Sequence, residues 1–135
     1  MIATHAATLL YIGLFALLLF VVSVRVTLLR RQHRVALGNG GHPDLERALR
    51  AQANFAEYTP MFLLVLAGLA FARVADITIH VLAILFLVGR IVHALAMYEE
   101  GPWHLRGRPV GMLLTWGPLI VGAVMLIGIA VTAVR

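Results

Sequence analysis

The chain contains no cysteine and no lysine, and it is poor in charge of either sign. The absence of cysteine excludes disulfides, thiolate metal sites and a thiol nucleophile supplied by the protein. Only 13% of the 135 residues are charged, against about 25% in an average soluble domain. This composition excludes an ordinary soluble globular domain.

Hydrophobic residues make up 61% of the chain, and the mean hydropathy is +0.94. They gather in four runs, at about residues 6–29, 48–72, 77–98 and 110–134. Each run supplies the ~20 residues with which an α-helix crosses ~30 Å of hydrocarbon, where backbone groups must bond within their own segment. The sequence therefore predicts an all-α integral membrane protein. Residues 1–135 form a single four-span domain, folded as an antiparallel four-helix bundle.

The arginines lie mainly at the ends of the predicted spans. The connections at residues 30–44 and 99–109 are arginine-rich, whereas the N-terminus and the second connection carry little charge. By the positive-inside rule, the two arginine-rich connections face the cytoplasm and both termini face the opposite side. This distribution explains most of the net charge of +5 without a nucleic-acid-binding patch, so no nucleic-acid partner is expected.

The first half of the second span carries polar side chains at membrane depth. At about 100° per residue, Arg47, Arg50, Asn54, Glu57 and Tyr58 fall within an arc of about 100° on one helix face. Ionisable groups at this depth cost at least ~2.5 kcal/mol each, and they persist where they pair, face the bundle interior or line a watery cavity. The pattern indicates a polar site on this face.

Antiparallel folding brings further charges to the same depth, where several arginines face one carboxylate, Glu57. This surplus of positive charge favours an anionic ligand. The alternative is a structural ion pair of Glu57 with Arg50 or Arg90 and no ligand. The residues expected to join the site are Arg90 and His93 near the end of the third span, and Arg106 and Arg108 at the start of the fourth.

The histidines give no metal-binding signature. His80 and His93 are 13 residues apart, too far for a metal-binding pair on one helix, and His33 and His42 are expected in loops or at interfaces. No metal site is predicted. The glycine-rich turn before His42 lacks the Lys-Ser/Thr of a phosphate-binding loop and is interpreted as a linker, followed by Asp44 as the predicted N-cap of the second helix.

Residues 46–60, Glu-Arg-Ala-Leu-Arg-Ala-Gln-Ala-Asn-Phe-Ala-Glu-Tyr-Thr-Pro, resemble the signature of the MAPEG family. These are the membrane-associated proteins of eicosanoid and glutathione metabolism, which include microsomal glutathione transferases and the leukotriene- and prostaglandin-forming synthases. The length, the four spans and the basic first connection match as well. The chain resembles a bacterial-type member of this family. The resemblance implies a homotrimer that binds glutathione between neighbouring subunits near the cytoplasmic face.

The resemblance also implies roles for individual residues. The family is expected to have a tyrosine one turn after His93, but this chain has Met97 at that position. The neighbouring Tyr98 is displaced from that helix face by about 100°. The arginine that activates the thiol is implied to be one of Arg30, Arg31, Arg106 and Arg108. The implied glutathione contacts are Arg50, Asn54, Glu57 and Tyr58, with Arg90 and His93 as further polar contacts.

The function implied is a glutathione-dependent transferase or peroxidase of a bacterial inner membrane, which acts on a lipophilic small molecule at a site open to lipid and cytoplasm. One alternative is a non-catalytic ligand-binding or structural membrane protein. The replacement of the family tyrosine by Met97 supports this alternative. Another is a small proton-coupled transporter that uses Glu57. The surrounding arginines argue against a transporter because they repel cationic cargo and keep Glu57 ionised.

Overall fold

Four long helices make up the protein in a computed structural model that describes residues 2–98 and 101–134, without the side chains of residues 2–5 and 104. Each helix covers a predicted span to within one residue, and no strand occurs in the described part of the chain. The all-α prediction is therefore confirmed. The helices are α1 (Ile2–His33), α2 (Pro43–Phe71), α3 (Asp76–Tyr98) and α4 (Pro102–Ala133).

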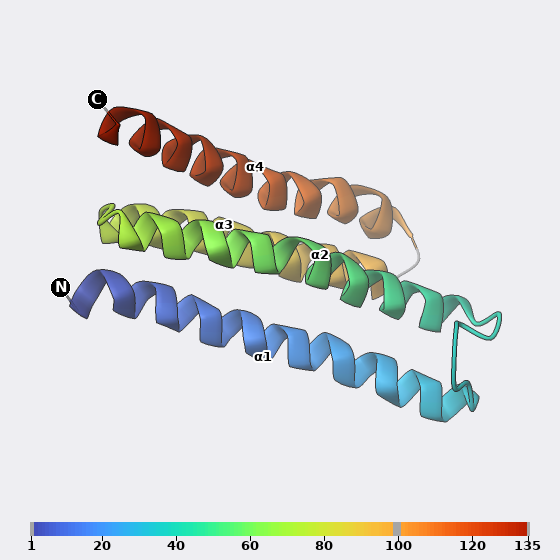
Figure 1. Ribbon diagram of the computed structural model, residues 1–135. Coiled ribbons are helices and arrows are strands. Elements are labelled where there is room, and N and C mark those ends of the chain that lie inside the picture. Colours follow the sequence, from blue (N-terminus) through green and yellow to red (C-terminus); the bar gives the residue numbers. More distant parts are fainter. Residues whose placement is uncertain (1, 99–100, 135) are drawn as a thin grey trace.

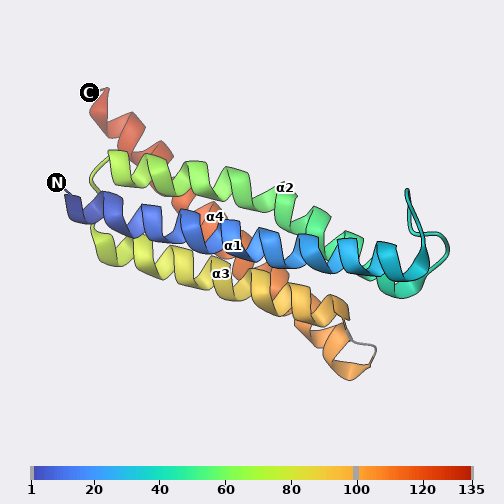
Figure 2. The same cartoon turned by 90° about the horizontal axis from the view of Figure 1, so that it is seen from below.

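Helices that follow one another in sequence run antiparallel, with α2 and α3 in the middle of the bundle (Figure 1). Helix α1 packs on both of them, α4 packs on both from another side, and α1 and α4 do not touch within the described residues. Figures 1 and 2 show the α1–α2 and α3–α4 connections at one end. Both termini lie at the other end, with the α2–α3 turn. This is the predicted antiparallel arrangement, and it puts the two arginine-rich connections at the same end of the bundle.

The start of α2 differs from the sequence expectation. Pro43 occupies the first helical turn, where its missing N–H costs no hydrogen bond, so the N-cap position falls on His42. The prediction of Asp44 as N-cap is wrong because Asp44 already lies inside the first turn. There its Oδ1 accepts a hydrogen bond from the Leu45 N–H at 2.8 Å.

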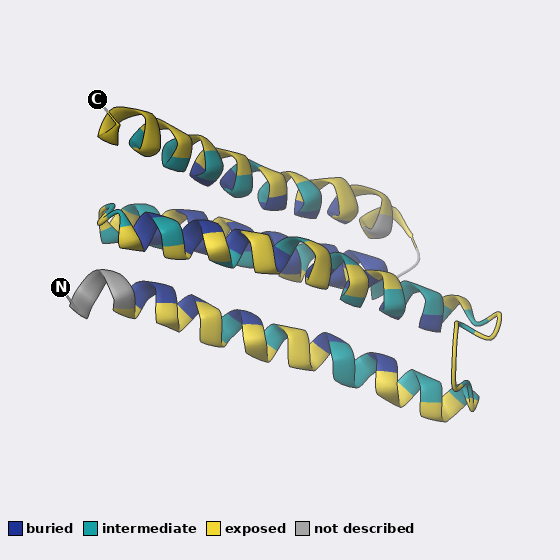
Figure 3. Ribbon diagram, viewed as in Figure 1, coloured by how far each residue is buried: buried dark blue, intermediate teal, exposed yellow. Residues whose placement is uncertain are grey.

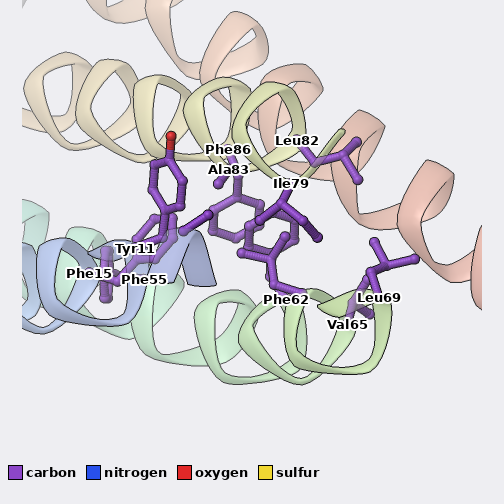
Figure 4. Close-up of a cluster of buried hydrophobic side chains, with 12 residues drawn as sticks. Tyr11, Phe15, Phe55, Phe62, Val65, Leu69, Ile79, Leu82, Ala83 and Phe86 are labelled. Atoms are coloured by element: carbon purple, nitrogen blue, oxygen red, sulfur yellow. The ribbon is translucent and has the colours of Figure 1, made fainter. Parts of the chain in front are cut away.

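An aromatic cluster holds α1, α2 and α3 together (Figure 4). The rings of Phe62 and Phe86 stack with centroids 3.9 Å apart, and Phe15 of α1 meets both rings edge-on. Such aromatic pairs contribute about 0.5–1.5 kcal/mol each beyond the area they bury. The cluster fixes α2 against α3 next to the polar part of the bundle, because Phe86 precedes Arg90 by one helical turn.

Helices α3 and α4 approach closely at glycines. A Cβ added at Gly111 would lie 2.7 Å from the backbone nitrogen of His93, and one added at Gly89 would lie 2.9 Å from the carbonyl carbon of Leu114. Backbone atoms cannot move aside cheaply, so these positions require glycine, as is usual where membrane helices pack closely. The contact sets α4 directly against the turn that carries Arg90 and His93.

The outer faces of the bundle are exposed (Figure 3), and they carry many large apolar side chains. In α4, only 17% of the most apolar stretch is buried within the single chain. All four helices are long and apolar enough to cross a membrane. An apolar exterior around a bundle of this length suits lipid or a second protein chain, not water.

Candidate functional site

Arg90 is the most buried charged side chain of the described residues, with 2% of its surface exposed. Its Nη1 donates to the side-chain oxygen of Asn54 at 2.5 Å and to the Asn54 carbonyl oxygen at 3.3 Å. Its Nη2 lies 3.7 Å from the sulfur of Met112 on α4. Arg90 therefore connects α3 to α2 and reaches α4, at the depth where the sequence predicts that charges of several helices converge.

The charge of Arg90 has no anionic partner in the part of the chain that the structure describes. Its Nε is buried without a hydrogen-bond acceptor there. The guanidinium carbon lies 5.8 Å from the Tyr58 ring centroid and 5.9 Å from that of Phe86, a weak compensation by the negative faces of the rings. Arginine keeps its proton even when buried, so a positive potential is built into this level of the bundle.

Glu57 and Arg50 lie on the outward face of α2 and are exposed. The Arg50 Nε donates to Glu46 Oε1 at 3.1 Å, a pair of side chains one turn apart on the same helix. Within the described residues, the alternative prediction of an ion pair between Glu57 and Arg50 or Arg90 is therefore wrong. A single chain leaves the Glu57 carboxylate uncovered on a membrane-spanning helix.

The six predicted ligand contacts thus separate into an inner and an outer group. Arg90 bonds Asn54 and lies over the Tyr58 ring between α2 and α3, while Arg50 and Glu57 lie on the adjacent outer face of α2. His93 is 5% exposed and packs against the α4 backbone at Gly111, one turn beyond Arg90. Asn54 and Tyr58 are half-buried and connect the two groups.

The four arginines implied for thiol activation all lie at the end of the bundle that carries the α1–α2 and α3–α4 connections (Figure 1). Arg31, Arg106 and Arg108 are exposed. The Arg30 Nη1 instead donates to the carbonyl oxygen of Ala36 at 3.0 Å, so Arg30 holds the chain as it leaves α1.

Two contacts were not predicted from the sequence. The guanidinium of Arg25 on α1 lies 3.6 Å from the Tyr98 ring centroid on α3, a close cation–π contact. Tyr98 therefore points to α1, while Met97 is buried at 4% exposure. Gln52 bonds Ser23 of α1 at 2.8 Å, so the opposite face of α2 is occupied by helix packing. The signal for Arg25 was its position inside the first span, five residues before the arginines at the end of α1.

Comparison with known proteins decides the family, because the MAPEG family matches residues 8–128. The chain belongs to the MAPEG family. Inner membrane protein YecN of Escherichia coli K12 is 34% identical over 112 residues, which cover 83% of each chain. Inner membrane protein YecN of Escherichia coli O6:H1, strain CFT073, gives the same values. The resemblance seen at residues 46–60 is thus confirmed, and with it a multi-pass membrane protein.

Proposed function

We propose that this MAPEG member is a membrane-bound, glutathione-dependent transferase or peroxidase that acts on a lipophilic electrophile. The observation that carries the proposal is the buried charge of Arg90. Among the described residues this charge contacts no carboxylate, and its guanidinium donates a hydrogen bond to the side chain of Asn54. A buried charge inside a membrane protein is usually paired with an opposite charge or belongs to a functional site. Glutathione is an anion of the required kind, with two carboxylates, one ammonium and two amides.

The two groups of residues offer matching partners for these ligand charges. Arg50, on the outer face, can form a bidentate contact with a carboxylate, and Glu57 can pair with the ammonium. Asn54 can bond an amide while Arg90 fixes its orientation from behind. Because Arg90 is 2% exposed, its contribution is positional and electrostatic, through Asn54 and the local potential.

The outer face of α2 supports a homotrimer with the ligand between subunits. An uncovered carboxylate at membrane depth is unfavourable unless another chain or a ligand covers it. A second copy seated on this face would cover Glu57 and close the open side of the site. The exposed apolar surface of α4 supplies further area for such contacts.

The chemistry follows from the lack of cysteine, because the nucleophile must be the thiol of the cosubstrate. A guanidinium near the sulfur stabilises the thiolate and lowers the pKa of the thiol. The thiolate then forms a carbon–sulfur bond, the leaving group departs with its electron pair, and the thiol proton passes to solvent. Arg106 and Arg108 are the leading candidates for the activating arginine, and Arg31 and Arg30 follow.

A second candidate function is non-catalytic ligand binding, and the buried Met97 favours it. Where the family resemblance implies a tyrosine hydroxyl, this chain places a thioether at 4% exposure. A thioether neither donates a proton nor stabilises a thiolate. In this case the chain would retain the binding residues and lack turnover.

Calorimetry of glutathione binding to the detergent-solubilised protein tests the binding site. We expect Arg50→Ala and Glu57→Ala each to weaken binding by about 2–4 kcal/mol, since each leaves a ligand charge buried without its partner. Gln52→Ala is the matched control, because Gln52 lies on the same helix and faces α1. It should lower stability slightly and leave affinity unchanged. Equal losses in all three variants would indicate a folding defect, and unchanged binding in Glu57→Ala would refute this site.

A further inference from the structure

Two histidines and a carboxylate meet where the chain passes from α1 to α2. His33 is the last residue of α1, His42 precedes α2, and Asp44 lies in the first turn of α2. The His33 Nε2 is 2.8 Å from Asp44 Oδ2, and the two imidazole rings stack with centroids 3.9 Å apart and planes inclined by 13°. One potential metal-ligand atom from each residue lies within 4.8 Å of the others.

The connection is folded so that these side chains are held together. The chain reverses through residues with positive φ: Arg34, Gly38, Gly40 and Gly41. A Cβ added at Gly40 would lie 2.5 Å from a methyl group of Val35, so the tight return requires glycine there. The His42 N–H donates to the Asn39 carbonyl oxygen at 3.0 Å, and the Asn39 side chain donates to Glu46 Oε2 at 2.6 Å. The turn is therefore anchored to the first turn of α2, which also carries Asp44.

The donor set specifies a class of cation. Imidazole nitrogen is a ligand for zinc and the later first-row transition metals, whereas magnesium and calcium prefer oxygen. Arg30, Arg31 and Arg34 lie in the same segment, so a cation held by charge alone is disfavoured here. Neutral imidazoles bind a transition metal by coordination, and Asp44 supplies one compensating negative charge.

A simple ion pair between His33 and Asp44 accounts for only part of this geometry. It leaves unexplained why His42, whose side chain makes no capping hydrogen bond, is stacked on His33. The three residues are half-buried, so the donors are partly shielded yet open to water. A tetrahedral ion with bonds of ~2.0–2.1 Å requires ligand atoms about 3.3 Å apart, a contraction that a glycine-rich connection permits.

We propose that His33, His42 and Asp44 bind one divalent transition-metal ion, with Zn²⁺ the best match, and that the ion staples the end of α1 to the start of α2. Three protein ligands leave the fourth position of a tetrahedral ion to water. This site is separate from the residues around Arg90, so the proposal does not depend on glutathione binding.

The first test measures zinc binding to the full-length, chelator-treated protein without a polyhistidine tag, in competition with a chromophoric chelator. We expect one Zn²⁺ per chain. His33→Ala, His42→Ala and Asp44→Asn should each bind at least about tenfold more weakly, since even the loss of an outer-shell partner costs a metal site 10–100-fold. The matched control is Gln32→Ala, an exposed neighbour of His33, which should bind like the wild type.

The second test uses the position of Arg34 inside the metal-closed loop. Zn²⁺ should slow tryptic cleavage after Arg34 at least about tenfold in the wild type and in Gln32→Ala, but not in His42→Ala. Circular dichroism checks that His42→Ala is folded, which we expect because α2 has no side-chain cap to lose there. Equal zinc affinity in the wild type and His42→Ala, or no binding near one ion per chain, would overturn the site.

Discussion

Replacing Asn54 by alanine should destabilise the protein more than replacing Arg90 by methionine, although the second change removes a larger side chain and a charge. In the wild type, the Asn54 side chain accepts the 2.5 Å hydrogen bond from Arg90. Asn54→Ala leaves the guanidinium buried, with the carbonyl oxygen at 3.3 Å and the sulfur at 3.7 Å as its remaining hydrogen-bond acceptors among the described residues. Arg90→Met removes the charge and fills the site with an unbranched apolar chain.

The magnitudes follow from the asymmetry between breaking a buried polar contact and replacing it. Loss of a hydrogen bond to a charged group costs about 1.5–3 kcal/mol when the charge stays buried. Replacement of a buried ion pair by apolar side chains of similar volume is often neutral or stabilising, and we apply the same reasoning to a buried charge that has no anionic partner. We therefore expect Asn54→Ala to lower the free energy of unfolding by about 2–3 kcal/mol, and Arg90→Met to change it by less than about 1 kcal/mol.

Unfolding in mixed micelles of a mild detergent and dodecyl sulfate, followed by circular dichroism, measures these differences. The double variant Asn54→Ala/Arg90→Met should be as stable as Arg90→Met alone, because no buried charge remains to be left unpaired. The reasoning is refuted if Arg90→Met is the less stable single variant. Arg90 would then be a net structural contributor, and its charge would need no ligand to explain it.

Two predictions concern assembly and orientation. If a second copy covers Glu57, native mass measurement in mild detergent should give three copies of the chain, whereas a stable monomer that still binds glutathione would rule out the intersubunit site. If the arginine-rich connections face the cytoplasm, the C-terminus faces the opposite side, so a reporter that works only after export should be active when fused after Arg135. Full activity there of a reporter that works only in the cytoplasm would reverse the orientation.

The helical fold and the shared depth of part of the candidate site could be predicted because both depend on local pattern. Four apolar runs fix four helices, and helical periodicity alone places Arg50, Asn54 and Glu57 on one face of α2. The depth shared by Asn54 and Arg90 follows from antiparallel connection, and the structure confirms it as a direct hydrogen bond.

Contacts that depend on rotation between helices or on loop conformation could not be predicted. The alternative pairing of Glu57 with Arg50 or Arg90 fails because that side of α2 faces outward, a rotation of the helix that periodicity does not determine. The stacking of Arg25 on Tyr98 depends on the geometry with which α1 packs against α3. His33 and His42 are nine residues apart in sequence, and only the turn through three glycines brings their rings together.

The central claim, that bound glutathione is activated by an arginine of this chain, is tested most directly by ultraviolet difference absorbance of the protein–glutathione complex at neutral pH. We predict a thiolate band in the wild type. In one of the four leucine variants of Arg30, Arg31, Arg106 and Arg108, the band should be lost along with turnover, while calorimetry still detects binding. Bound glutathione without a thiolate band in the wild type would contradict the enzyme assignment and leave a ligand-binding protein.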